Sequence, residues 1–478
     1  MSGRRQNPVP AGSPRASQIY RRLYTRRQIL KAGALGTAGL LVGACGEDET
    51  PATTAAPATT AAPATTAAPA RRTVPVLFDY GYAGIPGSMG QFWEEVTTRA
   101  AAEGIDVEGT EVALEDLAIR IEAAHAAQAG PSIETFYANY STYEFLEQGA
   151  IQPLDPLVGG DTEIDHWLFT SQRFNGMQYN SPLLAEISML VANRDIFNNA
   201  GVDLPDRFAS WDDMISALQK VKAAGDVPVI IGSADGFNSE KWVMASEMGF
   251  LDRTTDLTEW NLGLRSIDEP LASGWIDNIA QLRADQLIND DADKITEHQA
   301  LERFTAGEGA MMMLYPGAVF ALEEGQFDVV GYWQGPGAAS APMAVAGSGM
   351  VVTTFAEDAQ AAGDLIAFLH RPDQLKLFNE VTSELPCDDR FDASGLGTLA
   401  SRTWGLITDP NLPEPFWVHD FMHYDVIFSI IYPLGQEAVA GTPPDELRQK
   451  YNEQMEAWRE GNEEAMGRVQ GFYDAATA

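Results

Sequence analysis

Cysteine is nearly absent from this sequence: 478 residues contain only Cys45 and Cys387. A disulfide framework is therefore excluded, and stability has to come from a hydrophobic core. Basic residues are also scarce, because 31 lysines and arginines stand against 68 aspartates and glutamates. This imbalance argues against a nucleic-acid-binding surface, which needs a basic patch to meet the phosphates.

Long apolar runs are missing as well, with one short exception near the start. Residues 32–44 carry no charge over thirteen positions, whereas a membrane-spanning helix needs about 20. A short apolar run behind basic residues is typical of a signal peptide. The stretch TRRQILK at 25–31 resembles the twin-arginine export signal, and LVGAC at 41–45 resembles a bacterial lipobox, in which the cysteine is lipidated. We predict that residues 1–44 are removed and that Cys45 becomes the lipid anchor.

The segment that follows Cys45 is suited to be a tether, so residues 45–72 are expected to join the anchor to the folded part. Residues 51–70 repeat PATTAA three times, and such a tract buries too little apolar surface to offset its ordering entropy. Eight of the 31 basic residues precede Cys45 and all 68 acidic residues follow it, which leaves a net charge of −45. That charge disfavours adhesion to anionic lipid, so the anchor would be the only membrane link. An ordinary cleavage site followed by an unmodified thiol is the alternative.

Short strand-like and longer helix-like patterns alternate after the tether. About 405 residues lie beyond residue 72, more than one core usually holds, so two domains are expected. The alternation predicts an α/β fold. Strands are expected at 74–79, 133–138 and 227–232, and a helix at 91–102.

Two further helices are marked by their ends or faces. Ser210 is expected to cap a helix, with Asp213 as its capping-box partner, and Gly225 is expected to end it. Near the end of the chain, four apolar residues recur at helical spacing and predict a last long helix behind Pro443: Leu447, Tyr451, Met455 and Trp458.

Five segments in order carry a family resemblance. They are NSPLLAEISMLVANRDIF at 180–197, AGV at 200–202 with SWDD at 210–213, FTAGEGAM at 304–311, the stretch 336–349, and the helix 362–369 followed by Pro372. Together they resemble the extracellular solute-binding proteins of ABC importers, specifically the sugar-binding family that includes maltose-binding protein. The resemblance covers residues 73 to 460.

The resemblance implies a two-lobed α/β fold of the type II periplasmic-binding-protein kind, which holds its ligand between lobes that close about a hinge. Segments 180–197 and 336–349 would be the crossovers between lobes. We assign residues 73–182 and 335–385 to the first lobe, and residues 183–334 and 386–478 to the second.

The same resemblance points to ligand-binding residues. Glu186 matches a sugar-binding glutamate, and a solvated hinge carboxylate is the alternative. Tyr137, Asn139 and Tyr140 lie at the end of an expected strand, and the tyrosines match positions where the maltose-binding relative has a tryptophan and an aspartate. Aromatic faces suit sugar C–H surfaces and planar polar groups suit hydroxyl pairs.

Other candidates lie at expected strand ends or near the crossovers, where open α/β sheets bind ligands. Asp79, Tyr80 and Tyr82 follow the first strand, although the tyrosines alternatively cover a turn. Gly347 and Ser348 offer backbone N–H groups, with a plain tight turn as the alternative. The remaining candidates are Phe237, Asn238, Tyr315, Trp333 and Trp417.

The strongest sign of metal or catalytic chemistry is the pair His419 and His423, one helical turn apart with carboxylates beside them. Such spacing binds zinc when both imidazoles share a face, but the glutamate that a zinc protease needs after the first histidine is missing. Aromatic neighbours such as Trp417 favour packing or ligand contact instead. Motifs of serine hydrolases, phosphate-binding loops and calcium hands are absent, so neither a cofactor nor catalysis is expected.

We therefore expect a monomeric, lipid-anchored extracytoplasmic receptor that captures a sugar or oligosaccharide and delivers it to an ABC permease. A receptor for a polyamine, an amino acid or a peptide is the alternative within the binding class, with slight support from the negative charge. A secreted glycan hydrolase would need two carboxylates about 5 to 10 Å apart across a sugar bond, and no pair stands out. A wall protein that uses the scaffold without a ligand is a third alternative.

Overall fold

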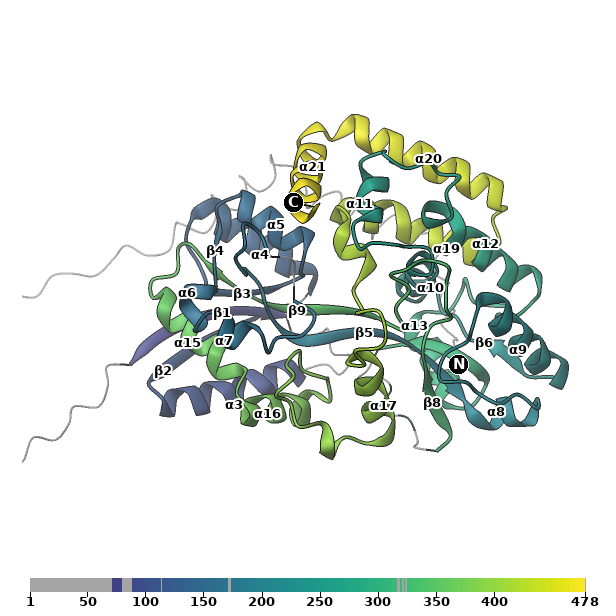
Figure 1. The fold of residues 1–478 in the computed structure, drawn as a ribbon, viewed down its shortest axis with the longest axis horizontal. Helices are drawn as coiled ribbons and strands as arrows, with labels where there is room; N and C mark the ends of the chain where they lie inside the picture. Colours follow the sequence, from purple (N-terminus) through teal and green to yellow (C-terminus); the bar gives the residue numbers. More distant parts are fainter. Residues whose placement is uncertain are drawn as a thin grey trace, which may run out of the picture.

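The computed structural model describes residues 71–79, 88–112, 114–170, 173–315 and 325–477, together with Val319 and Leu322. It forms two α/β lobes on one mixed sheet in the order β2-β1-β3-β9-β5-β7-β6, with β4 beside β9 and β8 beside β5 (Figure 1). In this part of the chain, no helix combines the length and the apolar character that crossing a bilayer requires. The predicted anchor Cys45, the signal peptide and the repeat tract all lie outside the described residues, as do Tyr80 and Tyr82.

Parallel strands β1 (Arg72–Asp79), β2 (Ile105–Val112) and β3 (Ile133–Phe136) form the sheet of the first lobe. Side chains of β1 alternate between its two faces, as the pleat requires. Val76 belongs to the core that includes Phe92 of α3, whereas Leu77 belongs to the core that includes Ile121 of α4. The helices of this lobe are α3 (Ser88–Ala102), α4 (Leu114–Ala127), α5 (Tyr140–Glu147), α6 (Asp155–Val158), α7 (Asp161–Ile164), α15 (Ala359–Leu369) and α16 (Pro372–Thr382).

The second lobe is built around β6 (Val227–Val229), β7 (Gly309–Leu314) and β8 (Phe327–Val330). Its core is rich in tryptophan, including the fully buried Trp242, Trp260 and Trp275. Its helices are α8 (Arg194–Asn199), α9 (Trp211–Ala224), α10 (Phe237–Met248), α11 (Asp256–Asn261), α12 (Pro270–Ala284), α13 (Glu297–Thr305), α19 (Tyr432–Ala440) and α20 (Pro444–Gly461).

Two long strands, β5 (Ser181–Asn193) and β9 (Ala344–Thr353), connect the lobes. The first part of β5 pairs antiparallel with β9, and its last part pairs with β7 and β8. β9 continues past β5 to pair with β3 of the first lobe. All thirteen residues of β5 are buried. Its sequence is apolar apart from Ser181, Glu186, Ser188 and Asn193, because a strand that is buried on both faces does not alternate apolar and polar residues.

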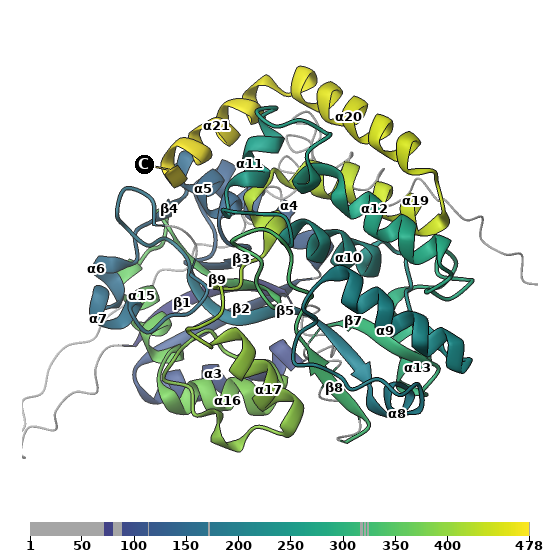
Figure 2. The same ribbon diagram turned by 45° about the vertical axis from the view of Figure 1, so that its right-hand side comes forward.

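The C-terminal region returns to the first lobe. α17 (Thr398–Ile407) packs against β8, and η2 (Val418–Phe421), α18 (Tyr424–Val426) and the π-helix η3 (Ile427–Ile431) lead into α19. α20 and α21 (Glu463–Thr477) then run along one edge of the molecule in both views (Figure 2). α21 ends against α5, so the last helix spans from the second lobe to the first.

Most elements agree with the sequence predictions. The strand at 74–79 and the helix at 91–102 are confirmed by β1 and α3. Ser210 accepts a hydrogen bond from the Asp213 N–H at 3.1 Å, and Gly225 ends α9 in the left-handed conformation. Two bounds were wrong: β6 and β3 end at Val229 and Phe136, before the predicted limits of 232 and 138. The predicted last helix is α20, but α21 follows it.

Candidate functional site

Glu186 lies in the middle of β5, on the strand that both lobes share, opposite Ala346 of β9. Glu186 is only 4% exposed. Burial of a carboxylate amid apolar residues costs free energy unless the group forms hydrogen bonds or ion pairs. Its charge reaches two tyrosines, Tyr315 and Tyr432. Burial raises the pKa of both phenols well above the usual value, and the charges of nearby carboxylates, Glu186 among them, raise it further. The two hydroxyls are therefore protonated at neutral pH.

Five aromatic rings form a continuous row beside this carboxylate, which we call the aromatic strip: Tyr137, Tyr424, Phe428, Tyr432 and Phe237. Successive ring centroids are 6.0, 4.2, 4.8 and 6.0 Å apart. Tyr137 follows β3 of the first lobe and Phe237 begins α10 of the second. The strip therefore runs from one lobe to the other.

The middle of the aromatic strip is set by helical spacing. Tyr424, Phe428 and Tyr432 are four residues apart along α18, η3 and α19, so their rings lie on one face. All three are partly exposed, and Phe237 is 43% exposed. Half-exposed rings in a row offer flat apolar surface to a ligand that also carries polar groups.

Lys241 supports the site from within the second lobe. Its side chain is 0% exposed, and its Nζ donates to both carboxylate oxygens of Glu297, at 2.7 and 2.8 Å. The same Nζ donates to the carbonyl oxygen of Phe237 at 3.1 Å and lies 3.9 Å from the ring centroid of Tyr315. One buried ammonium group thus fixes the end of the aromatic strip and one face of Tyr315.

The two candidate histidines have different surroundings. His419 is buried between two carboxylates of α10, with Nδ1 2.9 Å from Glu240 and Nε2 2.8 Å from Glu247. Burial lowers the pKa of His419, but the charges of and hydrogen bonds to these glutamates outweigh it and raise the pKa to about 10. Burial lowers the pKa of His423 to about 3, and its Nδ1 accepts the Asp425 N–H at 3.1 Å. His419 is thus a buried cation, whereas His423 is neutral and caps α18.

Among the described residues, one set of three side chains has the spacing of metal ligands: Glu163, His370 and Asp388. Arg390 forms ion pairs with both Glu163 and Asp388. His370 is hydrogen-bonded to Asp388 and, through Nε2, to Ser181 at 2.9 Å. A guanidinium group already supplies the positive charge at this set, which ties the start of β5 to the first lobe.

Comparison with known proteins identifies the family. The model of the bacterial extracellular solute-binding proteins matches residues 96–397, which is more than half of the chain. The chain belongs to this family. Membership implies an extracytoplasmic protein that binds a solute.

Individual relatives are distant. A binding protein of Brucella abortus (strain 2308) is 31% identical over 85 residues, which are 17% of this chain and about a fifth (20%) of that protein's length. MsmE, a binding protein of Bacillus subtilis subsp. subtilis in an open conformation, superposes with a TM-score of 0.66 at 16% identity, over 83% of this chain and 100% of that one. RafE in complex with raffinose superposes with a TM-score of 0.62 at 16% identity, over 80% and 98%. These likenesses confirm the two-lobed fold.

Four of the residues that we predicted from the sequence to bind ligand lie in the aromatic strip or beside it: Tyr137, Phe237, Glu186 and Tyr315. Three others have their side chains engaged in packing. Tyr140 is 1% exposed, with its ring against His423 and Phe472. Trp333 is buried against two tryptophans of the second lobe, Trp211 and Trp242. The Asn238 amide group donates to the carbonyl of Met313 at 3.0 Å and joins α10 to β7.

The remaining candidates lie at the ends of strands and helices or in the crossover strand β9. Asn139 has a φ of 53° and begins α5, and its side chain bonds Asp420. Gly347 pairs with Ala185 in the crossover sheet, and a Cβ there would lie 2.1 Å from the Phe169 carbonyl oxygen. Ser348 pairs with Leu184, Asp79 ends β1, and Trp417 is buried directly before η2.

The sequence patterns did not lead us to predict Tyr424, Phe428 and Tyr432 as ligand-site residues. The signal that would have found them is the recurrence of aromatic residues at intervals of four in 424–432.

Proposed function

We propose that this solute-binding protein captures a sugar or oligosaccharide between its lobes. The observation that carries the proposal is the aromatic strip, which runs from Tyr137 of the first lobe to Phe237 of the second beside the carboxylate of Glu186. A ligand that lies along the strip contacts residues of both lobes at once. Its binding energy therefore favours a closed form, with β5 and β9 as the connecting strands.

The chemistry of the site matches carbohydrate. Pyranose rings present C–H faces that stack on aromatic side chains, and their hydroxyls need acceptors and donors. Glu186 supplies carboxylate oxygens that can accept hydrogen bonds from these hydroxyls. The phenols of Tyr315 and Tyr432 stay protonated because their pKa values are raised, so they remain donors. The raffinose complex of RafE, which has the same fold, supports this choice of ligand class.

The remaining parts of the proposal concern transport. The lipobox at Cys45 would hold the receptor at the membrane, the PATTAA tract would let it reach a permease, and the closed pair of lobes would be the form that an ABC permease recognises. The receptor would act as a monomer and would break no bond in its ligand.

The ligand class is tested by thermal-shift screening of the mature chain against raffinose, chitin and xylan oligosaccharides, amino acids, peptides and spermidine. A ligand that binds only the folded state raises the melting temperature. We expect an oligosaccharide to do so, and titration calorimetry should then show that Glu186→Gln weakens it about tenfold or more, the value of one charged hydrogen bond. Asp290→Asn, an exposed carboxylate elsewhere, is the control and should leave affinity unchanged. Stabilisation by amino acids or peptides alone, or conversion of the glycan into shorter products, would contradict the proposal.

The anchor is tested by fractionation of cells that express Cys45→Ser. We expect the variant to leave the membrane fraction, because a single lipidated cysteine is the proposed attachment. Equal membrane retention of the variant and the parent would rule the anchor out.

A further inference from the structure

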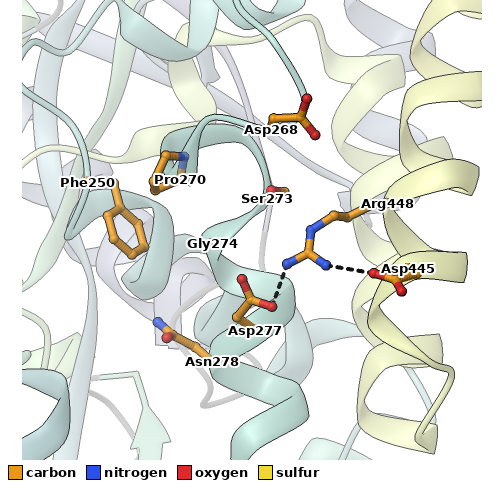
Figure 3. Close-up of a pocket in the computed structure, with 9 residues that line it drawn as sticks. All are labelled: Phe250, Asp268, Pro270, Ser273, Gly274, Asp277, Asn278, Asp445 and Arg448. Atoms are coloured by element: carbon orange, nitrogen blue, oxygen red, sulfur yellow. Dashed lines mark hydrogen bonds and ion pairs between the residues drawn. The ribbon is translucent and has the colours of Figure 1, made fainter.

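A pocket lies on the second lobe between α12 and the start of α20 (Figure 3). Its volume is about 520 Å³, which is sufficient for a small organic molecule. Nine residues line it: Phe250, Asp268, Pro270, Ser273, Gly274, Asp277, Asn278, Asp445 and Arg448. None of them is a member of the aromatic strip or a sequence candidate.

Negative charge exceeds positive charge in this pocket. Three aspartates line it against one guanidinium group. Arg448 Nη2 lies 2.5 Å from Asp277, and Arg448 Nη1 lies 3.4 Å from Asp445 (Figure 3). The single cation is thus already paired, while the exposed Asp268 makes no ion pair within the described part of the chain. The field inside the pocket attracts cations and repels anions.

Two buried polar side chains add acceptors. Ser273 is 4% exposed and Asn278 is 8% exposed, and neither side chain makes a hydrogen bond within the described residues. Figure 3 shows Ser273 on α12, on the side of the helix nearer to Arg448. Both side chains line the pocket, so a ligand that donates hydrogen bonds would satisfy them.

An aromatic ring forms the opposite wall. The ring of Phe250 lies so close to α12 that a Cβ on Gly274 would be 2.5 Å from it. Glycine at this position therefore lets the ring lie against the helix. An aromatic face near carboxylates is a favourable place for an ammonium group.

We propose that this pocket binds an organic cation with primary ammonium groups, of the diamine or polyamine class. An ammonium group donates three hydrogen bonds and accepts none, which matches a wall of carboxylate, hydroxyl and amide oxygens. The surplus carboxylates offset its charge, and Phe250 contacts its carbon chain. The site is separate from the proposed sugar site.

The test is calorimetric titration of the mature chain with spermidine at low ionic strength. We expect Asp268→Asn and Asp277→Asn each to weaken binding about fivefold, the scale of one exposed ion pair. The matched control Asp290→Asn removes the same charge outside the pocket and should have no effect. Arg448→Met should tighten binding, because it releases two aspartates, whereas Lys220→Met, an equal charge change on the exposed face of α9, should not. Melting temperatures without ligand verify that each variant folds.

Two results would overturn the assignment. One is equal affinity of Asp277→Asn and Asp290→Asn for spermidine, and the other is Phe250-dependent binding of a neutral sugar in this pocket. Glu186→Gln separates the two sites: spermidine affinity should be unchanged in that variant, whatever happens to the proposed sugar ligand. Spermidine binding that is lost in Glu186→Gln would place the cation between the lobes instead.

Discussion

Replacement of Lys241 by methionine should destabilise the second lobe and weaken ligand binding together. Lys241 is 0% exposed and Glu297 is 17% exposed in their ion pair. Methionine keeps most of the apolar stem but leaves the Glu297 carboxylate and the Phe237 carbonyl without their donor. Loss of one partner of a buried pair costs about 3 to 5 kcal/mol, and the remaining exposure of Glu297 places the expected loss at the lower end, about 3 kcal/mol.

The effect on the ligand site follows from the second contact of Lys241. The ammonium group lies 3.9 Å from the Tyr315 ring centroid and holds the Phe237 carbonyl. Without it, the ring and the end of the aromatic strip lose a fixed position. We expect the dissociation constant of the stabilising ligand to rise about tenfold, which corresponds to about 1.4 kcal/mol.

Thermal melting and titration calorimetry measure both effects. Lys220→Met makes the same change on the exposed face of α9 and should alter stability by less than about 0.5 kcal/mol. The double variant Lys241→Met with Glu297→Gln should recover part of the lost stability, since no unpaired carboxylate remains. If Lys241→Met melted like Lys220→Met and bound ligand equally well, the positioning role of Lys241 would be refuted.

Three further predictions follow from the same structure. Phe428→Ala should raise the dissociation constant for an oligosaccharide about tenfold, because loss of one stacked ring costs about 1 kcal/mol or more. Titration calorimetry measures this dissociation constant. Tyr140→Phe, a change in the core, is the control and should leave the affinity for the oligosaccharide unchanged. His419 is charged in the folded chain up to a pKa of about 10, above its ordinary 6.5. Its contribution to stability is therefore complete below pH 6.5 and is lost as the pH rises through 10, so the melting temperature should fall over this range, and His419→Gln should flatten the fall. Gly347→Ala should lower the melting temperature, because a Cβ would lie 2.1 Å from the Phe169 carbonyl oxygen and such crowding costs about 1 to 3 kcal/mol.

Each of these has an outcome that contradicts it. Unchanged affinity of Phe428→Ala would remove the aromatic strip from the ligand site. A melting temperature that rises between neutral and alkaline pH would contradict the buried cation at His419. A Gly347→Ala variant as stable as the parent would mean that β9 adjusts freely at this position.

Local chemistry explains why much of the fold was predictable. Residues that are close in sequence determine strand β1, the helix cap at Ser210 and the helix end at Gly225. These features could therefore be predicted from the sequence. The crossover at β5 was recognisable because residues 180–197 resemble a family segment in which a proline leads into an acidic residue and an apolar strand, and all of β5 is buried. α21 was not predicted: only Ala465, Val469 and Phe472 are buried in it, where it meets the first lobe.

The site was predictable only in part, because burial depends on tertiary packing. Glu186 was predicted from its place in the crossover and lies in β5 opposite Ala346 of β9, and its role in ligand binding stays a prediction. Tyr140 resembled a ligand residue in sequence, but its ring faces Phe472 of α21, a helix that was not predicted. Phe428 and Tyr432 become recognisable only when α18, η3 and α19 are seen to form one face.

The central claim is that an oligosaccharide binds between the lobes on the aromatic strip and Glu186. The most direct measurement is a crystal structure of the mature chain with the glycan that stabilises it most. The account predicts a sugar ring stacked on the Tyr424–Phe428–Tyr432 face with a hydroxyl on the Glu186 carboxylate. A glycan bound elsewhere, with the aromatic strip and Glu186 untouched, would contradict it.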